Sequence, residues 1–492
     1  MASIPLSISQ RLVLGCCGLA VAALLLIRRI FTPPRAIRHL PCVPILPLLR
    51  SYFLREPDDV RFQRLIMPFA DEKGEGIVVV WTGMWMIHII DYKLFVQVST
   101  ASQTFQKARI PVGSMLQRYL GTSNVAQVNG DEWKRQSSHL QMAFAQPLPI
   151  DVFTSLARNA FEVIEAASSH SGTTFTVRWS DITQNFALDA VGKSILGHHF
   201  DALRLRSPFV ADYNQMMYDM ADPLYLVFPI LEYFLPRHKV VARMDRLLQK
   251  FQHLIDAKRS DPGDDIMTFL LKDSEMSRDT LLHNVATLFM AGHDTTSGAM
   301  SSLVYYLAVD RRIQSKAREE VLRVLGPTDD PSAALMNAQS LPYLHACIRE
   351  ALRINTPISV LVPRVAHADL TLGKYHIPAG SQLMCNIYAV QHGKSTWNDP
   401  EVFRPERFLE STKQRQPWLP FSVGPRQCPG QNFAQYELRT LAAVLLRRYE
   451  WSLSEGSIHA GGIKNAFSRF TMTIPKELDV TFKLFDPQVG RQ

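Results

Sequence analysis

The run Phe421–Gly430, FSVGPRQCPG, constrains this chain more than any other segment. It places one cysteine, Cys428, in a turn dense in proline and glycine, which fixes unusual backbone angles and leaves amides outside regular structure. Those amides and the nearby Arg426 guanidinium favour a thiolate over a thiol. The run therefore predicts a rigidly presented thiolate, serving as a metal ligand or as a nucleophile. The alternative is a buried structural cysteine in a tight turn.

The pattern Phe421-x-x-Gly424-x-Arg426-x-Cys428-x-Gly430 resembles the haem-ligand loop of the cytochrome P450 family at every defined position. In that family a cysteine thiolate holds the iron of haem b, iron protoporphyrin IX. The resemblance implies that Cys428 is the axial ligand of the haem iron, and that Phe421, Arg426 and Gly430 help to bind the cofactor. It also implies a mainly α fold with small β-sheets, as in a microsomal, eukaryotic and fungal member.

A second motif, Ala291-Gly-His-Asp-Thr-Thr296, lies inside a predicted helix. Its glycine and hydroxyl residues weaken a helix interior. One interpretation is a helix with a polar face, and the other is a local opening where a ligand sits. The segment resembles the family's oxygen-activating motif, which implies catalytic roles for two residues. Asp294 would relay protons, and Thr295 would hydrogen-bond to dioxygen.

Two further motifs suggest a structural triad. Glu350 and Arg353 stand three residues apart on one predicted helix face, a spacing that alone contributes little. Downstream, Phe403-Arg-Pro-Glu-Arg-Phe408 resembles the family's partner segment. The resemblance implies that Glu350, Arg353 and Arg407 form a buried triad that locks the segment before the cysteine loop.

Haem propionates need cations, and the resemblance supplies two of them, Arg426 and Arg364. Trp133 matches the family's W-x-x-x-R motif, but Ser137 stands where that motif has its arginine. This is a departure from the family pattern. Arg135 and His139 are the possible substitutes, but neither shares the motif's spacing, so the third cation stays open.

Composition and charge exclude several classes of protein. Of 492 residues, 47% are hydrophobic and 20% charged, as in an ordinary globular protein. The net charge is +8, but the basic residues are scattered along the chain and form no stripe interleaved with aromatic residues. This argues against nucleic-acid binding. Membrane surfaces and acidic partners attract the same charge. Six sparse cysteines without a CxxC pair indicate neither a disulfide framework nor a zinc site.

The run Leu12–Ile27 carries no charge and is followed by Arg28 and Arg29. It is short for a membrane-spanning helix, and a cleaved signal peptide is the alternative. We expect residues 1–31 to form a transmembrane signal anchor and residues 32–492 to form the haem-thiolate catalytic domain. Because the arginine excess follows the apolar run, the positive-inside rule places that domain in the cytosol. The expected location is the endoplasmic reticulum membrane, crossed once.

Periodicity predicts several elements of secondary structure. Strands are expected over 78–81 and 86–90 as a pair, with a hairpin over 370–380. Helices are expected over 279–308, 311–325, 343–354 and 432–449.

The expected activity is a monooxygenase that oxidises a lipophilic small molecule with dioxygen, in secondary metabolism. No flavin or nicotinamide module follows the helix over 432–449, so electrons must come from a separate NADPH–cytochrome reductase. The predicted basic docking face consists of Lys134, Arg135, Arg439, Arg447 and Arg448. The resemblance implies that six residues contact the substrate: Phe289, Met290, Ile358, Val360, Leu361 and Phe467. The alternative for each of them is packing in the core.

Three alternatives stay open at this point. The first is a haem-thiolate isomerase or dehydratase that acts on a peroxide and needs no reductase. The second is a haem-binding sensor or electron carrier without turnover. The third is a membrane-anchored protein with a structural cysteine and no haem.

Overall fold

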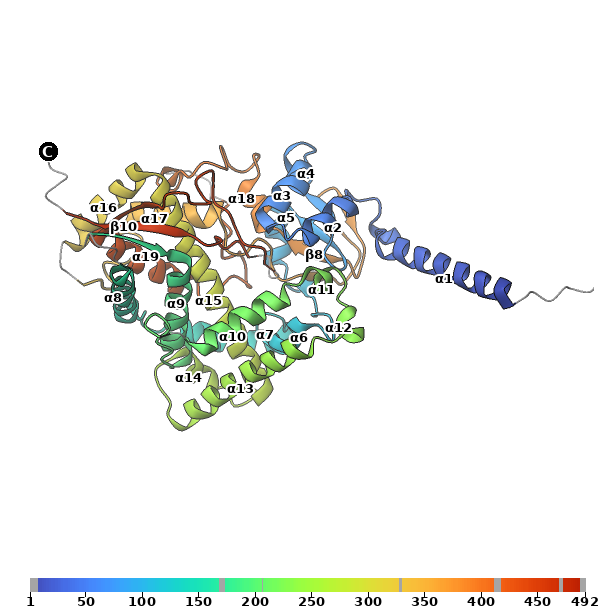
Figure 1. The fold of residues 1–492 in the computed structure, drawn as a ribbon, viewed down its shortest axis with the longest axis horizontal. Helices are drawn as coiled ribbons and strands as arrows, with labels where there is room; N and C mark the ends of the chain where they lie inside the picture. Colours follow the sequence, from blue (N-terminus) through green and yellow to red (C-terminus); the bar gives the residue numbers. More distant parts are fainter. Residues whose placement is uncertain are drawn as a thin grey trace, which may run out of the picture.

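The computed structural model describes residues 8–167, 173–205, 207–326, 330–410, 417–468 and 472–486. Helices make up most of the molecule, and small sheets lie at two of its sides (Figure 1). This confirms the fold class predicted from the sequence, mainly α with small β-sheets.

The largest sheet has five strands in the order β1-β2-β8-β5-β3. The strands are β1 (Ile77–Trp81), β2 (Trp85–Ile89), β8 (Gln382–Cys385), β5 (Arg364–Ala366) and β3 (Phe105–Lys107). Pairing of β3 with β5 is antiparallel and sets Lys107 directly opposite Arg364. The register therefore makes cross-strand neighbours of two basic residues that are far apart in the sequence.

The other sheets are smaller. A three-stranded sheet has the order β4-β10-β9, from β4 (Thr174–Arg178), β10 (Asp479–Leu484) and β9 (Tyr449–Leu453). A hairpin joins β6 (Leu370–Leu372) to β7 (Tyr375–Ile377).

The helix α15 (Arg278–Val309) runs through the body of the molecule, in contact with α9 (Trp179–Val191), α17 (Pro342–Ile354) and α19 (Gln431–Arg448). It begins at Ser277, whose hydroxyl accepts a hydrogen bond from the Thr280 amide and so caps the first turn. Most of its residues are buried, as expected of a helix surrounded by other elements.

The other helices complete the fold. They are α1 (Ile8–Ile30), α2 (Ile45–Phe53), α3 (Asp58–Leu65), α4 (Met67–Asp71), α5 (Tyr92–Thr100), α6 (Met115–Leu120), α7 (Gly130–Phe144), α8 (Ile150–Ala166), α10 (Pro208–Met220), α11 (Pro223–Val227), α12 (Leu231–Phe234), α13 (His238–Ser260), α14 (Ile266–Leu271), α16 (Arg311–Leu325) and α18 (Ile387–His392), with the short turns η1 (Arg35–Ile37), η2 (Gly192–Leu196) and η3 (Pro405–Phe408).

The predicted elements are present with small shifts at their ends. The strand pair over 78–81 and 86–90 is β1 and β2, joined antiparallel. The helix predicted over 311–325 has the same bounds as α16, and α15 extends the prediction by one residue at each end. The helix predicted over 432–449 ends one residue earlier, because Tyr449 begins β9.

The helix α1 projects away from the rest of the molecule (Figure 1). Within the part of the chain that the structure describes, none of the helices combines the length and the apolar character needed to cross a lipid bilayer. The predicted transmembrane anchor over residues 1–31 therefore gains no support from the structure.

Candidate active site

A cavity of about 1170 Å³ lies between α15 and the cysteine loop, and Cys428 and Thr295 both line it. Cys428 is enclosed by the body of the protein, but its side chain is exposed because it faces this internal space. Burial raises the pKa of the Cys428 thiol to about 11, and the Gly430 amide opposes that rise. The predicted cysteine thus faces a space large enough for a cofactor and a substrate together.

Gly424 allows the loop its shape. Gly424 has a φ of +82°, and a side chain there would meet the Ser99 carbonyl oxygen at 3.1 Å. A side chain at Gly430 would lie 3.4 Å from the Phe144 ring. The Cys428 amide donates to the Phe421 carbonyl at 3.0 Å, which closes the turn just before α19 begins.

Arg426 does not stabilise the thiolate, and that prediction is wrong. Its guanidinium donates to the Val128 carbonyl at 2.7 Å and to Asn129 Oδ1 at 3.2 Å. It also lies over the Trp133 ring, with 4.0 Å between its central carbon and the ring centroid. Arg426 is therefore held by acceptors on the chain just before α7 and by the Trp133 ring.

Three cations gather beside this loop. Lys107 and Arg426 line the cavity, and the amide of Lys107 and the guanidinium of Arg426 share the acceptor Asn129 Oδ1. Arg364 does not reach the cavity wall. It is buried beside Lys107, where its guanidinium donates to the Phe105 carbonyl at 2.9 Å. Burial together with the charges of Arg364 and Arg426 lowers the pKa of Lys107 to about 7.

This cluster fits an anionic group. In the described part of the chain, none of the three cations forms an ion pair with a carboxylate (the partners of Lys107, Arg364 and Arg426 are backbone or amide oxygens). Like charges directly opposite on adjacent strands are unfavourable. A ligand that brings carboxylates to the cavity edge removes that repulsion, and the two propionates of haem are such carboxylates.

Lys107 is a candidate for the third cation, which the sequence left open, and the two other candidates, Arg135 and His139, are engaged with a carboxylate. Arg135 pairs with Asp273, and His139 Nδ1 lies 3.7 Å from the same carboxylate. Ser137 itself lines the cavity with a short side chain. The motif around Trp133 does not include Lys107, so no signal in the sequence pointed to it. The register of β3 and β5, which sets Lys107 opposite Arg364, brings it to the cluster.

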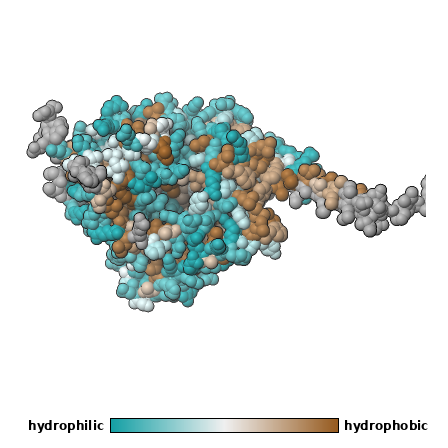
Figure 2. All heavy atoms as spheres, viewed as in Figure 1, coloured by the Kyte–Doolittle hydropathy of each residue, from teal (hydrophilic) through white to brown (hydrophobic). Residues whose placement is uncertain are grey.

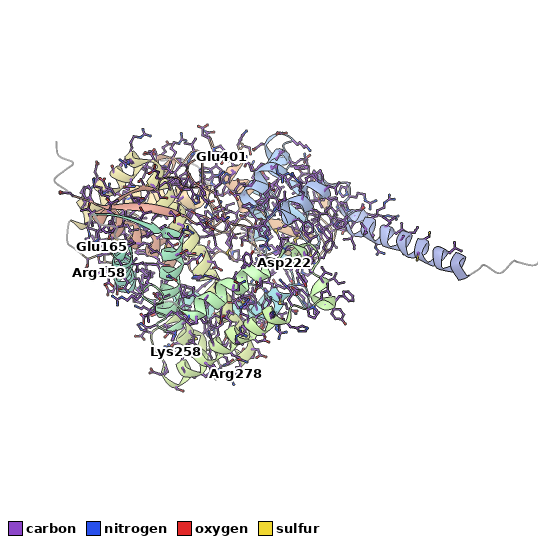
Figure 3. All side chains as sticks on the ribbon, in the orientation of Figure 1. Arg158, Glu165, Asp222, Lys258, Arg278 and Glu401 are labelled. Carbon is purple, nitrogen blue, oxygen red and sulfur yellow. The ribbon has the colours of Figure 1, made fainter. Side chains whose placement is uncertain are left out.

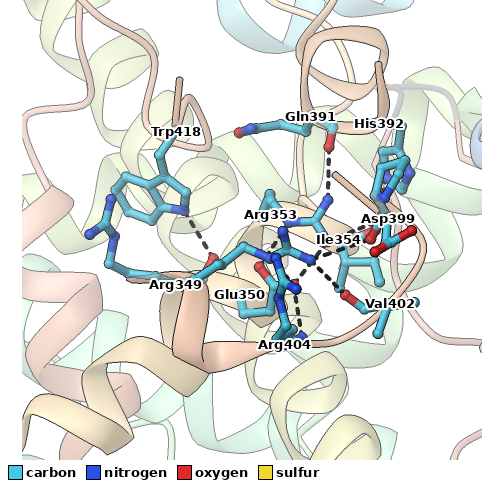
Figure 4. Close-up of polar contacts among 12 residues, drawn as sticks. Arg349, Glu350, Arg353, Ile354, Gln391, His392, Asp399, Val402, Arg404 and Trp418 are labelled. Carbon is cyan, nitrogen blue, oxygen red and sulfur yellow. Dashed lines mark hydrogen bonds and ion pairs between the residues drawn. The ribbon is translucent and has the colours of Figure 1, made fainter. Parts of the chain in front are cut away.

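The structure brings the predicted triad together, and Figure 4 labels two of its members, Glu350 and Arg353. Arg353 Nε donates to Glu350 Oε2 at 2.8 Å, and Arg407 Nε donates to Glu350 Oε1 at 2.9 Å. Glu350 and Arg353 are fully buried. Arg353 also donates to the carbonyls of Gln391 and Pro400, which lie on the chain leading to the cysteine loop. The triad therefore connects α17 to that segment.

The two predicted catalytic residues face different surroundings. Thr295 lines the cavity, and its hydroxyl donates to the Ala291 carbonyl one turn earlier. Asp294 turns away from the cavity, toward Tyr213 and His293. The helix is continuous through the motif, so the predicted local opening is wrong. Gly292 serves packing instead, because a side chain there would lie 2.8 Å from Val191 of α9.

The cavity wall is largely apolar. Four of the predicted contacts line it: Met290, Ile358, Val360 and Leu361. Phe289 does not, because it is fully buried with its ring stacked on His293 at 5.7 Å. Phe467 lies outside the lining and beneath the Arg61 guanidinium, 6.0 Å away.

The predicted basic docking face is wrong at Arg439, and the other predicted members that are described below keep exposed or partly exposed side chains. Arg439 is buried, where it donates to the Met336 carbonyl and to His345. Arg448 is held by Glu165 of α8, which is labelled in Figure 3, with 2.6 Å between nitrogen and oxygen. Arg135 is paired with Asp273. Lys134 stays largely exposed, next to Asp131.

A helical fold with a cysteine loop open to a large cavity, and cations at the cavity edge, defines a thiolate site for a haem-like cofactor. The family model for cytochrome P450 matches residues 40–478. The chain belongs to the cytochrome P450 family.

Similar proteins extend this picture. Human "Cytochrome P450 2J2" is 33% identical over 243 residues, covering 46% of this chain and 48% of that protein. "7-deoxyloganic acid hydroxylase" from Catharanthus roseus is 26% identical over 414 residues, covering 77% of this chain and 78% of that protein. The chain thus spans about half the length of the first of these relatives. The crystal structure of the cytochrome P450DA heme domain has a TM-score of 0.76 at 21% identity, covering 91% of this chain and 98% of that one. This last likeness concerns the fold alone.

Proposed function

We propose that the protein is a haem-thiolate monooxygenase that oxidises a lipophilic small molecule. The observation that carries the proposal is that Cys428 and Thr295 line one cavity, whose wall is mostly apolar. A thiolate ligand and a hydroxyl group are thereby brought to the same enclosed space. Membership of the cytochrome P450 family supports the same reaction class.

Each group in the cavity has a distinct role in this proposal. Cys428 would hold the iron, and Lys107 and Arg426 would bind the propionates at the cavity edge. When bound, haem supplies the oxidising chemistry, which thiolate ligation favours. Thr295 places its hydroxyl group at the cavity wall. The apolar lining would orient the substrate and exclude water.

We also propose hydroxylation of a secondary metabolite as the reaction type. The apolar contacts Met290, Ile358, Val360 and Leu361 suit a lipophilic skeleton. The name of one similar protein supports hydroxylation, "7-deoxyloganic acid hydroxylase" from Catharanthus roseus. Electrons would come from an NADPH-dependent reductase.

Attachment to a membrane belongs to the same proposal. Figure 2 shows an apolar patch on the body of the molecule next to α1. Its exposed apolar residues lie on α2 and around α12: Leu46, Phe53, Leu54, Ile230, Tyr233, Phe234 and Leu235. Such a patch suits a lipid surface. The single membrane crossing, the cytosolic domain and the endoplasmic reticulum location stay predictions. Removing residues 1–31 should reduce recovery in the membrane fraction without changing the haem spectrum.

Turnover under ¹⁸O₂ tests the monooxygenase proposal. Lipophilic compounds that shift the ferric Soret band are incubated with the full chain, a reductase and NADPH. The expected result is a product that carries one labelled oxygen atom and requires both dioxygen and NADPH. Conversion of a peroxide without reductase would favour the isomerase or dehydratase instead. Absence of turnover with every compound that shifts the band would contradict the proposal.

A further inference from the structure

The side chain of His293 lies between two hydrogen-bond acceptors and is fully buried. Its Nδ1 is 3.0 Å from Asp294 Oδ1, and its Nε2 is 3.1 Å from the carbonyl oxygen of Gln184 on α9. A carbonyl oxygen never donates a proton. Nε2 must therefore carry a hydrogen to make a favourable contact with Gln184.

The contact with Asp294 then needs a second proton. With Nε2 protonated, a neutral His293 presents a lone pair at Nδ1 to the Asp294 carboxylate, which repels it. One proton between Nδ1 and Oδ1 removes this repulsion. The residue pair therefore holds one more proton than a neutral imidazole and an ionised carboxylate hold separately.

Tyr213 decides where that proton lies. Its hydroxyl, on α10, donates to Asp294 Oδ2 at 2.6 Å, and its buried ring packs edge-on against His293 with 5.4 Å between centroids. A hydrogen bond to a carboxylate favours the ionised form. The shared proton is thus assigned to His293, which becomes an imidazolium facing the carboxylate of Asp294.

The other group near this unit is Tyr119 on α6. It is fully buried, and its hydroxyl has no partner in the described part of the chain. The groups that face the His293–Asp294 pair are therefore Tyr213 from α10, Tyr119 from α6 and the Gln184 carbonyl from α9. Nothing among these three supplies a second cation to compete with His293.

We propose that His293 and Asp294 store one transferable proton directly behind Thr295, with Tyr213 and Gln184 as positioning residues. The use of this proton rests on the proposed monooxygenase function, but its presence does not. In the transfer step the proton passes from His293 Nδ1 to Asp294, which leaves a neutral imidazole and a neutral carboxylic acid. Asp294 then gives the proton to a water molecule or a hydroxyl group and returns to its ionised form. A proton from solvent restores the pair.

The first test reads the protonation state directly. Histidine labelled with ¹⁵N at both ring positions is introduced into the full-length haem protein, and spectra are recorded for the diamagnetic ferrous carbon-monoxide form. The His293 signals are assigned by their loss in His293→Gln. We expect His293 to retain both ring protons at pH 7.5, where exposed histidines are mostly neutral. In Asp294→Asn the second proton should be lost. A His293 with a single ring proton at pH 7.5 would overturn the proposal.

The second test reads the use of the proton. With a reductase, NADPH and any compound that the protein turns over, the yield of product per NADPH is compared across variants. His293→Gln keeps a polar side chain but no labile proton, and its yield should fall by roughly tenfold, with more hydrogen peroxide released. Tyr213→Phe also removes a hydrogen bond to Asp294 but leaves the stored proton, so its loss should be several-fold smaller.

The two tests separate the storage of the proton from its use in turnover. Equal losses in His293→Gln and Tyr213→Phe would show that only packing around Asp294 matters, and would overturn the storage of a proton. Failure of the monooxygenase proposal would abolish turnover in every variant but would leave the ¹⁵N spectra unchanged. Tyr218→Phe, on the exposed side of α10, is the matched control for changes to this helix.

Discussion

The guanidinium of Arg426 lies over the indole of Trp133, 4.0 Å from the ring centroid, and so ties the cysteine loop to α7. A stacked cation and indole attract each other through the ring quadrupole, by about 0.5–2 kcal/mol. The same guanidinium donates to two carbonyls on the chain before α7. Trp133 thus holds in place the cation that we propose to bind a haem propionate.

Replacing Trp133 should therefore weaken haem retention. In Trp133→Leu, Arg426 loses its aromatic support and the cation becomes mobile. We expect a lower ratio of Soret to protein absorbance and faster transfer of haem to apomyoglobin. Trp133→Phe retains an aromatic face and should lie between Trp133→Leu and the unchanged protein. Equal haem loss rates in all three proteins would contradict this role.

Lys107 should matter for haem binding through its charge. Lys107→Met removes the charge with little change in length, so one propionate loses its partner. The expected result is a faster loss of haem, with Lys107→Arg close to the unchanged protein. Lys134→Met serves as the control, because that lysine is exposed and paired with Asp131. Unchanged haem affinity in Lys107→Met would show that Lys107 does not replace the arginine missing at Ser137.

The Glu350 triad should be costly to break. Glu350→Gln leaves two buried guanidinium groups without their carboxylate, and losing one partner of a buried pair costs about 3–5 kcal/mol. We expect the urea midpoint to fall strongly. The control is Arg204→Gln, since Arg204 and Glu162 are both exposed and such pairs contribute about 0–1 kcal/mol. Similar midpoints for the two variants would contradict a structural role for the triad.

His88 should make the protein sensitive to acid. Burial and the Arg61 charge lower the pKa of His88 to about 3 in the folded protein, against 6.5 ordinarily. The unfolded chain takes up a proton between these values and the folded chain does not, so stability falls as pH drops from about 6.5 toward 3. His88→Gln should reduce the difference in unfolding free energy between pH 7 and pH 5 by up to about 2 kcal/mol. Urea unfolding at both pH values measures this.

The matched control for His88 is the exposed His253, whose replacement by glutamine should leave the pH dependence unchanged. If His88→Gln and the unchanged protein lose stability equally between pH 7 and pH 5, the buried neutral imidazole does not contribute.

Local patterns predicted the parts of this site that lie within one segment. The turn around Cys428 depends on glycines and prolines in the run itself, and α15 and α16 follow from periodicity, so neither needs distant residues. Glu350 and Arg407 were predicted together only because both of their motifs resemble the family's.

Contacts between distant segments were not predictable. Tyr213 reaches Asp294 across 81 positions, and Lys107 meets Arg364 only through the register of β3 and β5. Arg426 was expected beside the sulfur because it is close in sequence, but acceptors on another segment turn it away. The residues around Arg439 in the sequence do not distinguish it from an exposed arginine, but tertiary packing buries its side chain.

The central claim is that the sulfur of Cys428 binds the haem iron. The most direct measurement is the absorption spectrum of the reduced protein under carbon monoxide, for the unchanged chain and for Cys428→Ser. The expected result is a strongly red-shifted Soret band in the unchanged chain and its loss in the variant. An identical red-shifted band in both proteins, or its absence from a haem-loaded unchanged chain, would contradict thiolate ligation by Cys428.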